Sequence, residues 1–274
     1  MSVPKSVETP SLQGARTGTA FYECQNVALQ VGAGTARQRT ILEDVNFTIG
    51  SGEFVSVLGG SGVGKTTLLR VLGGLHQPAP ESTVIFRGSP VTAPPDGIVT
   101  VFQDYSKSLL PWRTVERNVT LGIESTSSRT ERHEAALAAL RMVGLADRRG
   151  DYPSQLSGGM QQRLQIARAL VMRPAGLLMD EPFGALDAMT KSSLQDILLD
   201  IQAQTKMTIV FVTHDIDEAV YLSDRIFVLG GAPARVAAEL TVDLPRPRDQ
   251  ISTKELPRFL ELRHAAYQAI GAHA

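Results

Sequence analysis

The sequence lacks several features that would place it in other classes of protein. With one cysteine in 274 residues, Cys24, it forms no intramolecular disulfide, which fits a reducing compartment. Its 27 basic and 28 acidic residues give a formal net charge of -1, so no overall field attracts nucleic acid and we expect no nucleic-acid partner. No apolar run is long enough to cross a bilayer, and no basic segment followed by an apolar core marks a secretory signal. We therefore expect the chain to reach a membrane only through a partner.

What the sequence does contain is a glycine-rich stretch between a predicted strand and a predicted helix. Residues 54–58 (FVSVL) form an apolar run, residues 59–67 read GGSGVGKTT, and residues 68–72 (LLRVL) fit the first turns of a helix. In this context the pattern G-x-x-x-x-G-K-[ST] binds phosphate, because backbone N–H groups and the helix N-terminus converge on one anion. Lys65 then reaches the β- and γ-phosphates, and the Thr66 hydroxyl ligates Mg²⁺. The residues predicted to bind nucleotide here are Gly59, Gly60, Ser61, Gly62, Val63, Gly64, Lys65, Thr66 and Thr67.

Two adjacent carboxylates follow a second apolar run. Residues 177–179 (LLM) predict a buried strand that ends in Asp180 and Glu181. Such a pair is costly unless a cation or a proton transfer uses it. Asp180 suits Mg²⁺. Glu181, expected on the other side of the strand by its period of two, suits orienting or deprotonating a water.

Two more predicted strands deliver polar side chains to their ends. The strand over residues 98–102 leads to Gln103, and the strand over residues 208–212 leads to His214. Ligands gather at the carboxyl ends of strands in α/β sheets, so both residues are candidates for the same site. Taken alone, a glutamine such as Gln103 is more often a solvated loop residue than a ligand. A lone histidine such as His214 is more often a structural hydrogen-bonding group than a catalytic one.

A second possible anion site begins the helix that runs from Ser157 to a stop before Pro174. Ser157 is a good N-cap, and Gly158 and Gly159 leave backbone amides bare at the helix start. For these three residues taken alone, an ordinary capped helix is the favoured interpretation.

The pattern along the chain predicts an α/β fold. A mostly parallel sheet flanked by helices forms a P-loop NTPase core, with an N-terminal antiparallel β layer and an inserted α-helical subdomain at about residues 104–173. We expect residues 1–20 to be a disordered tail. Residues 226–229 are predicted to be the last strand, and residues 241–274 form a C-terminal extension with a helix over residues 255–270.

Taken together, these motifs resemble those of the ATP-binding subunits of ABC transporters. The likeness covers about residues 21–231, and it implies an ABC ATPase domain over residues 21–240. The signature, LSGGMQQR, is the most discriminating piece, because other phosphate-loop proteins lack it. The matching segments are the Walker A loop at 59–66, the Q-loop at Gln103, the signature at 156–163, Walker B at Asp180 with Glu181, the D-loop at 185–187 and the H-loop at His214.

A narrower resemblance is to the ATPases of nitrate, taurine and aliphatic sulfonate importers. It implies a small, anionic solute such as nitrate, a sulfonate or a taurine-like molecule. The segments that carry it are 101–105 (VFQDY), 108–115 (SLLPWRTV), 152–163, 182–184 (PFG) and 244–248 (LPRPR).

The resemblance implies an ATPase that works as a head-to-tail homodimer. Residues 59–67 of one subunit and Ser157, Gly158 and Gly159 of the other hold the same ATP. Mg²⁺ is ligated by Thr66 and Gln103, with Asp180 behind a water; Glu181 is the general base. Lys65 and Gln103 belong to the catalytic group, His214 contacts the γ-phosphate, and Asp187 links the two sites across the dimer. The implied partners are integral membrane permease subunits and, indirectly, a periplasmic or extracellular solute-binding protein, with the ATPase peripheral on the cytoplasmic face of the inner membrane.

Two departures and one ambiguity accompany the resemblance. The family usually stacks an aromatic on adenine, but that position falls near Val31, and Phe21 and Tyr22 come too early. Gly60 stands where proline is common, and we expect the loop to survive this. Trp112 either packs in the core or lines a groove that docks the permease.

Three alternatives remain open from the sequence. These are the ATPase of a lipid- or drug-moving ABC system, a soluble ABC ATPase without a transporter, and a nucleotide-gated module without turnover. One set of motifs with no long insert argues against the soluble factor, and the presence of Glu181 with His214 argues against the inactive module.

Overall fold

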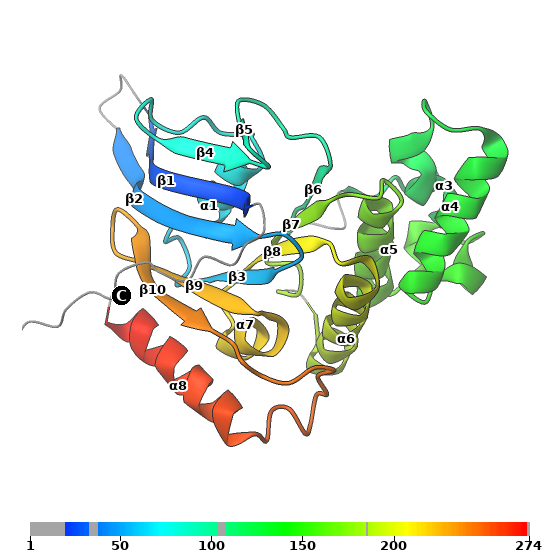
Figure 1. Ribbon diagram of the computed structural model, residues 1–274. Coiled ribbons are helices and arrows are strands. Elements are labelled where there is room, and N and C mark those ends of the chain that lie inside the picture. Colours follow the sequence, from blue (N-terminus) through cyan, green and yellow to red (C-terminus); the bar gives the residue numbers. More distant parts are fainter. Residues whose placement is uncertain (1–19, 33–37, 104–107, 185, 273–274) are drawn as a thin grey trace, which may run out of the picture.

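The computed structural model describes residues 20–32, 38–103, 108–184 and 186–272. Within these ranges the chain forms two sheets, with helices packed around the larger one and a helical lobe at the side (Figure 1). The predicted tail over residues 1–20 lies outside the described residues except for Ala20, which opens the first strand. None of the described helices is long and apolar enough to cross a bilayer.

The larger sheet is mostly parallel, as the sequence predicts. Its strands are β3 (Phe54–Leu58), β6 (Ile98–Val101), β7 (Gly176–Asp180), β8 (Thr208–Thr213), β9 (Arg225–Gly230) and β10 (Arg235–Thr241). Among the described residues they lie in the order β10-β9-β3-β8-β7-β6, and β10 alone runs antiparallel to its neighbour. Strands β3, β7 and β8 are buried along their whole length, because α1 (Lys65–Leu72) and the smaller sheet cover one face and helices cover the other. The segments that follow β3, β6, β7 and β8 therefore meet at one edge.

The smaller sheet forms the expected N-terminal β layer. Its strands are β1 (Ala20–Val31), β2 (Arg39–Gly50), β4 (Thr83–Phe86) and β5 (Ser89–Pro90), all paired antiparallel. The rings of Phe21, Tyr22 and Phe86 pack against one another. The Tyr22 hydroxyl also donates to the Leu72 carbonyl at 3.0 Å, which ties this layer to the end of helix α1 (Lys65–Leu72). The two early aromatics are thus core residues.

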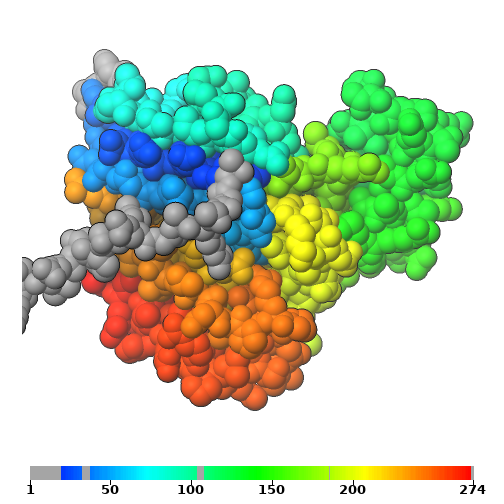
Figure 2. Space-filling model, viewed as in Figure 1, coloured from blue at the N-terminus to red at the C-terminus, as the bar shows by residue number. Residues whose placement is uncertain are grey.

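The helical lobe lies at the side of the larger sheet (Figures 1 and 2). It contains α3 (Val115–Val119), α4 (Arg129–Met142) and α5 (Gly158–Leu170), with 3₁₀ turns η1 (Thr120–Ile123), η2 (Ala146–Arg148) and η3 (Pro153–Gln155). Helix α5 lies against the sheet, and α3 and α4 lie farther out. A capping box starts α4: Ser128 and Glu131 exchange hydrogen bonds of 3.3 and 2.7 Å. The first residues of the predicted helical segment, 104–107, lie outside the described residues.

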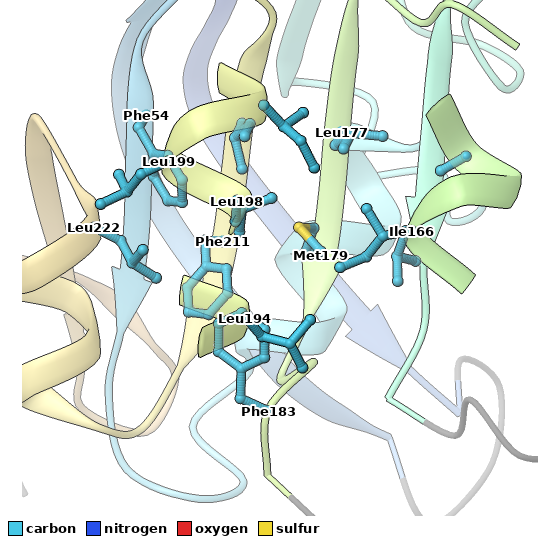
Figure 3. Close-up of a cluster of buried hydrophobic side chains, with 14 of the residues drawn as sticks. Phe54, Ile166, Leu177, Met179, Phe183, Leu194, Leu198, Leu199, Phe211 and Leu222 are labelled. Carbon is cyan, nitrogen blue, oxygen red and sulfur yellow. The ribbon is translucent and has the colours of Figure 1, made fainter. Parts of the chain in front are cut away.

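Helix α6 (Ala188–Thr205) covers one face of the larger sheet. Its Leu194, Leu198 and Leu199 pack among the side chains of strands β3, β7 and β8 (Figure 3). Phe183 lies in the same cluster and is buried. Because Phe183 comes two residues after Glu181, this packing fixes the turn that carries both carboxylates.

The C-terminal part differs from the prediction in one respect. Residues 226–229 do not form the last strand, because β10 follows and pairs with β9. The turn between them is anchored on β2, where Ala234 exchanges backbone hydrogen bonds with Ile41 and Glu43 at 2.9 and 3.0 Å. The segment RVAAELT alternates weakly and is poor in aromatic and β-branched residues, so its strand character comes from this pairing.

Residues 244–248 (LPRPR) are not helical, as predicted, and they hold the end of helix α7 (Ile216–Leu222). Arg248 donates to the Tyr221 and Ser223 carbonyls at 2.7 and 2.8 Å. Burial lowers the pKa of Arg248 to about 10. Helix α8 (Pro257–Gly271) then packs locally through the predicted apolar positions Phe259, Leu262 and Ala266.

Candidate functional site

The glycine-rich loop joins β3 to α1, in the order the sequence predicts. At its centre the Lys65 side chain is only 4% exposed. Its ammonium donates to the carbonyls of Gly59 and Gly60, both at 2.9 Å, and lies 3.4 Å from Glu181 Oε1. The loop therefore presents a buried positive charge at the start of a helix, which is the arrangement that binds phosphate.

The geometry of this loop requires glycine at Gly59 and Gly64, among others. A Cβ on Gly59 would lie 2.8 Å from the Leu229 carbonyl, and Gly64 has a φ of +116°, which side-chain-bearing residues rarely adopt. Gly60 differs, because a Cβ there would meet nothing within 4 Å. The space at Gly60 agrees with the expectation that this departure leaves the loop intact.

A hydroxyl and a carboxylate meet beside the loop. Thr66 Oγ1 donates to Asp180 Oδ1 at 3.0 Å, which joins the start of α1 to the end of β7. Burial raises the pKa of Asp180 above its ordinary value, although the Thr66 hydrogen bond opposes this. Described residues hold no group of three or more His, Cys, Asp or Glu that could bind a metal alone. One hydroxyl and one carboxylate fit Mg²⁺ instead, since this ion usually shares a few protein oxygens with substrate phosphates.

Glu181 lies between two cationic or polar partners. Its Oε1 is 3.4 Å from Lys65 Nζ, and its Oε2 is 3.1 Å from Nδ1 of His214, whose side chain is 52% exposed. The expected strand alternation does not hold, because β7 ends at Asp180 and Glu181 has a positive φ of 41°. Asp180 and Glu181 consequently both reach the first residues of α1.

Gln103 lies near the same edge but does not join the Thr66–Asp180 pair. It is exposed, and its Nε2 lies 3.8 Å from where a Cβ on Gly184 would stand. No hydrogen bond connects it with Thr66 or Asp180 in the part of the chain that the structure describes. Its segment is held from α5, where Gln165 donates to the Phe102 carbonyl at 3.2 Å.

Ser157 caps α5 as predicted, accepting from the Met160 amide at 3.4 Å. Ser157 and Gly158 are exposed, whereas Gly159 is buried. A Cβ on Gly159 would lie 2.2 Å from Thr190 Cγ2, so this glycine lets α5 approach α6. Among described residues, no hydrogen bond joins the start of α5 to the phosphate loop of the same chain.

Asp187 has a local role that its motif does not reveal. It caps α6, with Oδ1 accepting from the amides of Met189 and Thr190 at 3.1 and 3.0 Å. Hydrogen bonds from Thr190, with one from Met189, hold the pKa of this carboxyl below its ordinary value. Ala185, which precedes it in the predicted D-loop, lies outside the described residues.

The fold and the loop define a nucleotide-binding α/β protein of the P-loop NTPase class. The family model described as "ABC transporter" matches residues 42–184, more than half of the chain. The chain belongs to the ABC transporter family, and its cassette is of the ATP-binding type, as the sequence predicts.

The similar proteins include ones named for nitrate import and for bicarbonate transport. The chain is 46% identical over 231 residues to the nitrate import ATP-binding protein NrtC of Synechococcus elongatus, covering 83% of this chain and 35% of that protein. It thus spans about a third of NrtC. It is 42% identical over 262 residues to the bicarbonate transport ATP-binding protein CmpD of Synechocystis sp., covering 94% of this chain and 90% of that protein.

Solved structures resemble the whole cassette. CbiO1 of Clostridium perfringens, described as part of the ABC transporter complex cbiONQ, matches with a TM-score of 0.74 and 28% identity over 81% of this chain and 89% of that one. The cassette MJ0796, described as a dimeric post-hydrolysis state bound to ADP and Pi, matches with a TM-score of 0.69 and 34% identity over 81% and 98%. These likenesses confirm the predicted fold class.

Proposed function

We propose that this protein is the ATP-hydrolysing subunit of an ABC import system. The observation that carries the proposal is the position of Glu181, which lies between Lys65 and His214 beside the Thr66–Asp180 pair. A carboxylate held between two nitrogen groups at a phosphate loop is placed to accept a proton from a water that attacks the γ-phosphate.

The roles of the residues are those that the resemblance implies, and the positions of Lys65, Thr66, Asp180, Glu181 and His214 support them. Amides of residues 59–67 and the Lys65 ammonium bind the β- and γ-phosphates. Glu181 acts as the general base, and His214 contacts the γ-phosphate and helps to orient the water. Because charge in the transition state spreads over the phosphoryl oxygens, positioning and electrostatics supply most of the rate. Mg²⁺, held by Thr66 and Gln103 with Asp180 behind a water, would neutralise charge on the phosphates.

The functional unit in this proposal is a head-to-tail homodimer. Ser157 and Gly158 are exposed at the start of α5 and make no hydrogen bond, within the described ranges, to their own phosphate loop. They are free to complete the site of a second copy, with Gly159 behind them and Asp187 near the contact between the two sites. The dimeric state described for MJ0796 supports this arrangement.

The proposed transporter moves a small anion, such as nitrate, a sulfonate or a taurine-like solute. The names of the nitrate and bicarbonate relatives support an anionic cargo. Membrane permease subunits carry it, a solute-binding protein delivers it, and this ATPase is peripheral on the cytoplasmic face of the inner membrane. Trp112 is 71% exposed, which rules out a core role and favours a place in the permease groove.

Hydrolysis by the purified chain and by Glu181→Gln tests the proposal. The wild type should release phosphate from ATP, and the variant should bind ATP with turnover reduced by a factor of about 100 or more. The variant should also accumulate as a dimer in ATP, but not in ADP, during size-exclusion chromatography. Near wild-type turnover by Glu181→Gln would show that the base is another group.

A further inference from the structure

Lys191 in α6 joins two segments of the candidate site. Its Nζ lies 3.1 Å from Asp215 Oδ2 and 3.0 Å from Glu218 Oε1. Asp215 directly follows His214, and Glu218 lies in the first turns of α7. A single ammonium therefore links the start of α6 to the turn that carries His214.

The turn itself is built around Glu218, which is 5% exposed. Glu218 Oε2 accepts from Thr213 Oγ1 at 2.6 Å, and the Asp215 amide donates to the same hydroxyl oxygen at 3.0 Å. The Glu218 amide donates to Asp215 Oδ1 at 3.2 Å. Both residues that flank His214 are thus bonded into one network that Lys191 anchors.

Lys191 favours the charged forms of the two carboxylates in this network. Burial raises the pKa of Glu218, while Thr213 and Lys191 act in the opposite direction. Burial alone would lower the pKa of Lys191, yet its bonds to Glu218 and Asp215 hold that pKa above the ordinary value. Removing two carboxylates and one ammonium from water costs free energy, which their mutual attraction offsets only in part. Such a cluster is therefore poor evidence that its role is stability alone.

The same turn of α6 contacts the start of α5. The Lys191 amide donates to the Asp187 carbonyl at 2.9 Å, and the neighbouring Thr190 packs on Gly159. Lys191 thus stands where α6 contacts the α5 start on one side and the His214 turn on the other.

We propose that Lys191 is a positioning residue for ATP hydrolysis. It fixes the His214 turn against α6, so that Nδ1 of the half-exposed His214 stays 3.1 Å from Glu181. Without this anchor the turn keeps its internal hydrogen bonds but loses its ion pairs to α6, and a shift of about 1 Å at a reacting group can cost 100-fold in rate. The inference rests on the proposed function, because it assigns a task to His214 in hydrolysis.

Steady-state ATP hydrolysis by the full-length chain tests the proposal. Lys191→Met should lower kcat by about 10-fold to 100-fold, while the KM for ATP and the affinity for ADP stay within about twofold. Lys191→Arg should restore most of kcat, since it can bond to both carboxylates. Lys254→Met is the matched control. Lys254 lines one surface pocket together with Lys191, Asp215 and Glu218, but it bonds to Gln250 and lies over Tyr221, so the kcat of this variant should be unchanged.

A double variant separates positioning from folding stability. Lys191→Met with Glu218→Gln removes the buried charge left behind, so its melting temperature should recover while kcat stays low. Recovery of kcat together with the melting temperature would overturn the proposal, as would a Lys191→Met kcat within about twofold of wild type. If the wild-type chain hydrolyses no ATP, the proposed function is refuted. If the wild type and all variants hydrolyse ATP at equal rates, only the role of Lys191 is refuted.

Discussion

Replacing Gly159 by alanine tests how closely α5 and α6 are packed. The added Cβ would lie 2.2 Å from Thr190 Cγ2, far inside van der Waals contact, so Thr190 or the start of α5 must move. Overpacking of this kind costs about 1–3 kcal/mol. For a chain of this size we expect the melting temperature to fall by about 3–10 °C.

A second substitution relieves the same clash. Thr190→Ser removes Cγ2 and keeps the hydroxyl, and the remaining Thr190 atoms lie 3.6 and 3.8 Å from the new Cβ. Gly159→Ala with Thr190→Ser should therefore regain most of the lost melting temperature. Gly150→Ala is the control, because a Cβ there meets nothing within 4 Å.

The assay pairs thermal unfolding with ATP hydrolysis for all of these variants. If Gly159 is needed only for packing, the double variant recovers both properties. If the bare start of α5 must also reach the nucleotide of a second subunit, stability returns and hydrolysis does not. A Gly159→Ala protein that melts at the wild-type temperature would refute the packing argument.

Three further substitutions give separate tests. Val31 is 38% exposed at the end of β1, where it pairs with Arg39 at the start of β2. Val31→Tyr should tighten ATP binding up to about tenfold in calorimetry. An unchanged affinity, matching that of a Gln30→Tyr control, would mean that adenine lies elsewhere. Asp187→Ala should lower the melting temperature at pH 7. Because the pKa of Asp187 is depressed in the folded state, the stability advantage of the wild type is full above the unfolded pKa of about 3.9 and disappears as the pH falls through the folded pKa. A difference in melting temperature that does not depend on pH would contradict this. Trp112→Ser should change stability by less than about 0.5 kcal/mol while weakening co-purification with membrane permease subunits, whereas a large loss of stability would place Trp112 in a packed contact.

The parts of the site at the ends of buried strands were predictable from sequence. The apolar runs before Gly59, Gln103, Asp180 and His214 have the length and composition of parallel strands, and such strands end at one edge. Local signals also sufficed at Ser128, whose capping box with Glu131 is present. The grouping of distant motifs therefore followed from fold class.

Features that depend on tertiary contact were not predictable. Strand β10 depends on pairing with β9 and on the anchor at Ala234, and its own sequence carries little strand preference. Period-two reasoning does not apply at Glu181, because β7 ends at Asp180 and Glu181 has a positive φ. Lys191 carries no motif, and only the approach of α6 to α7 reveals its two carboxylate partners.

The contacts of residues 244–248 (LPRPR) show what a resemblance in this run can indicate. Arg248 and Arg246 bond to the carbonyls and to Asp224 at the end of α7, so they serve the closing turn of a helix. These contacts give the two guanidinium groups a structural task inside this chain. The run therefore bears on how this helix ends and carries no information about a cargo.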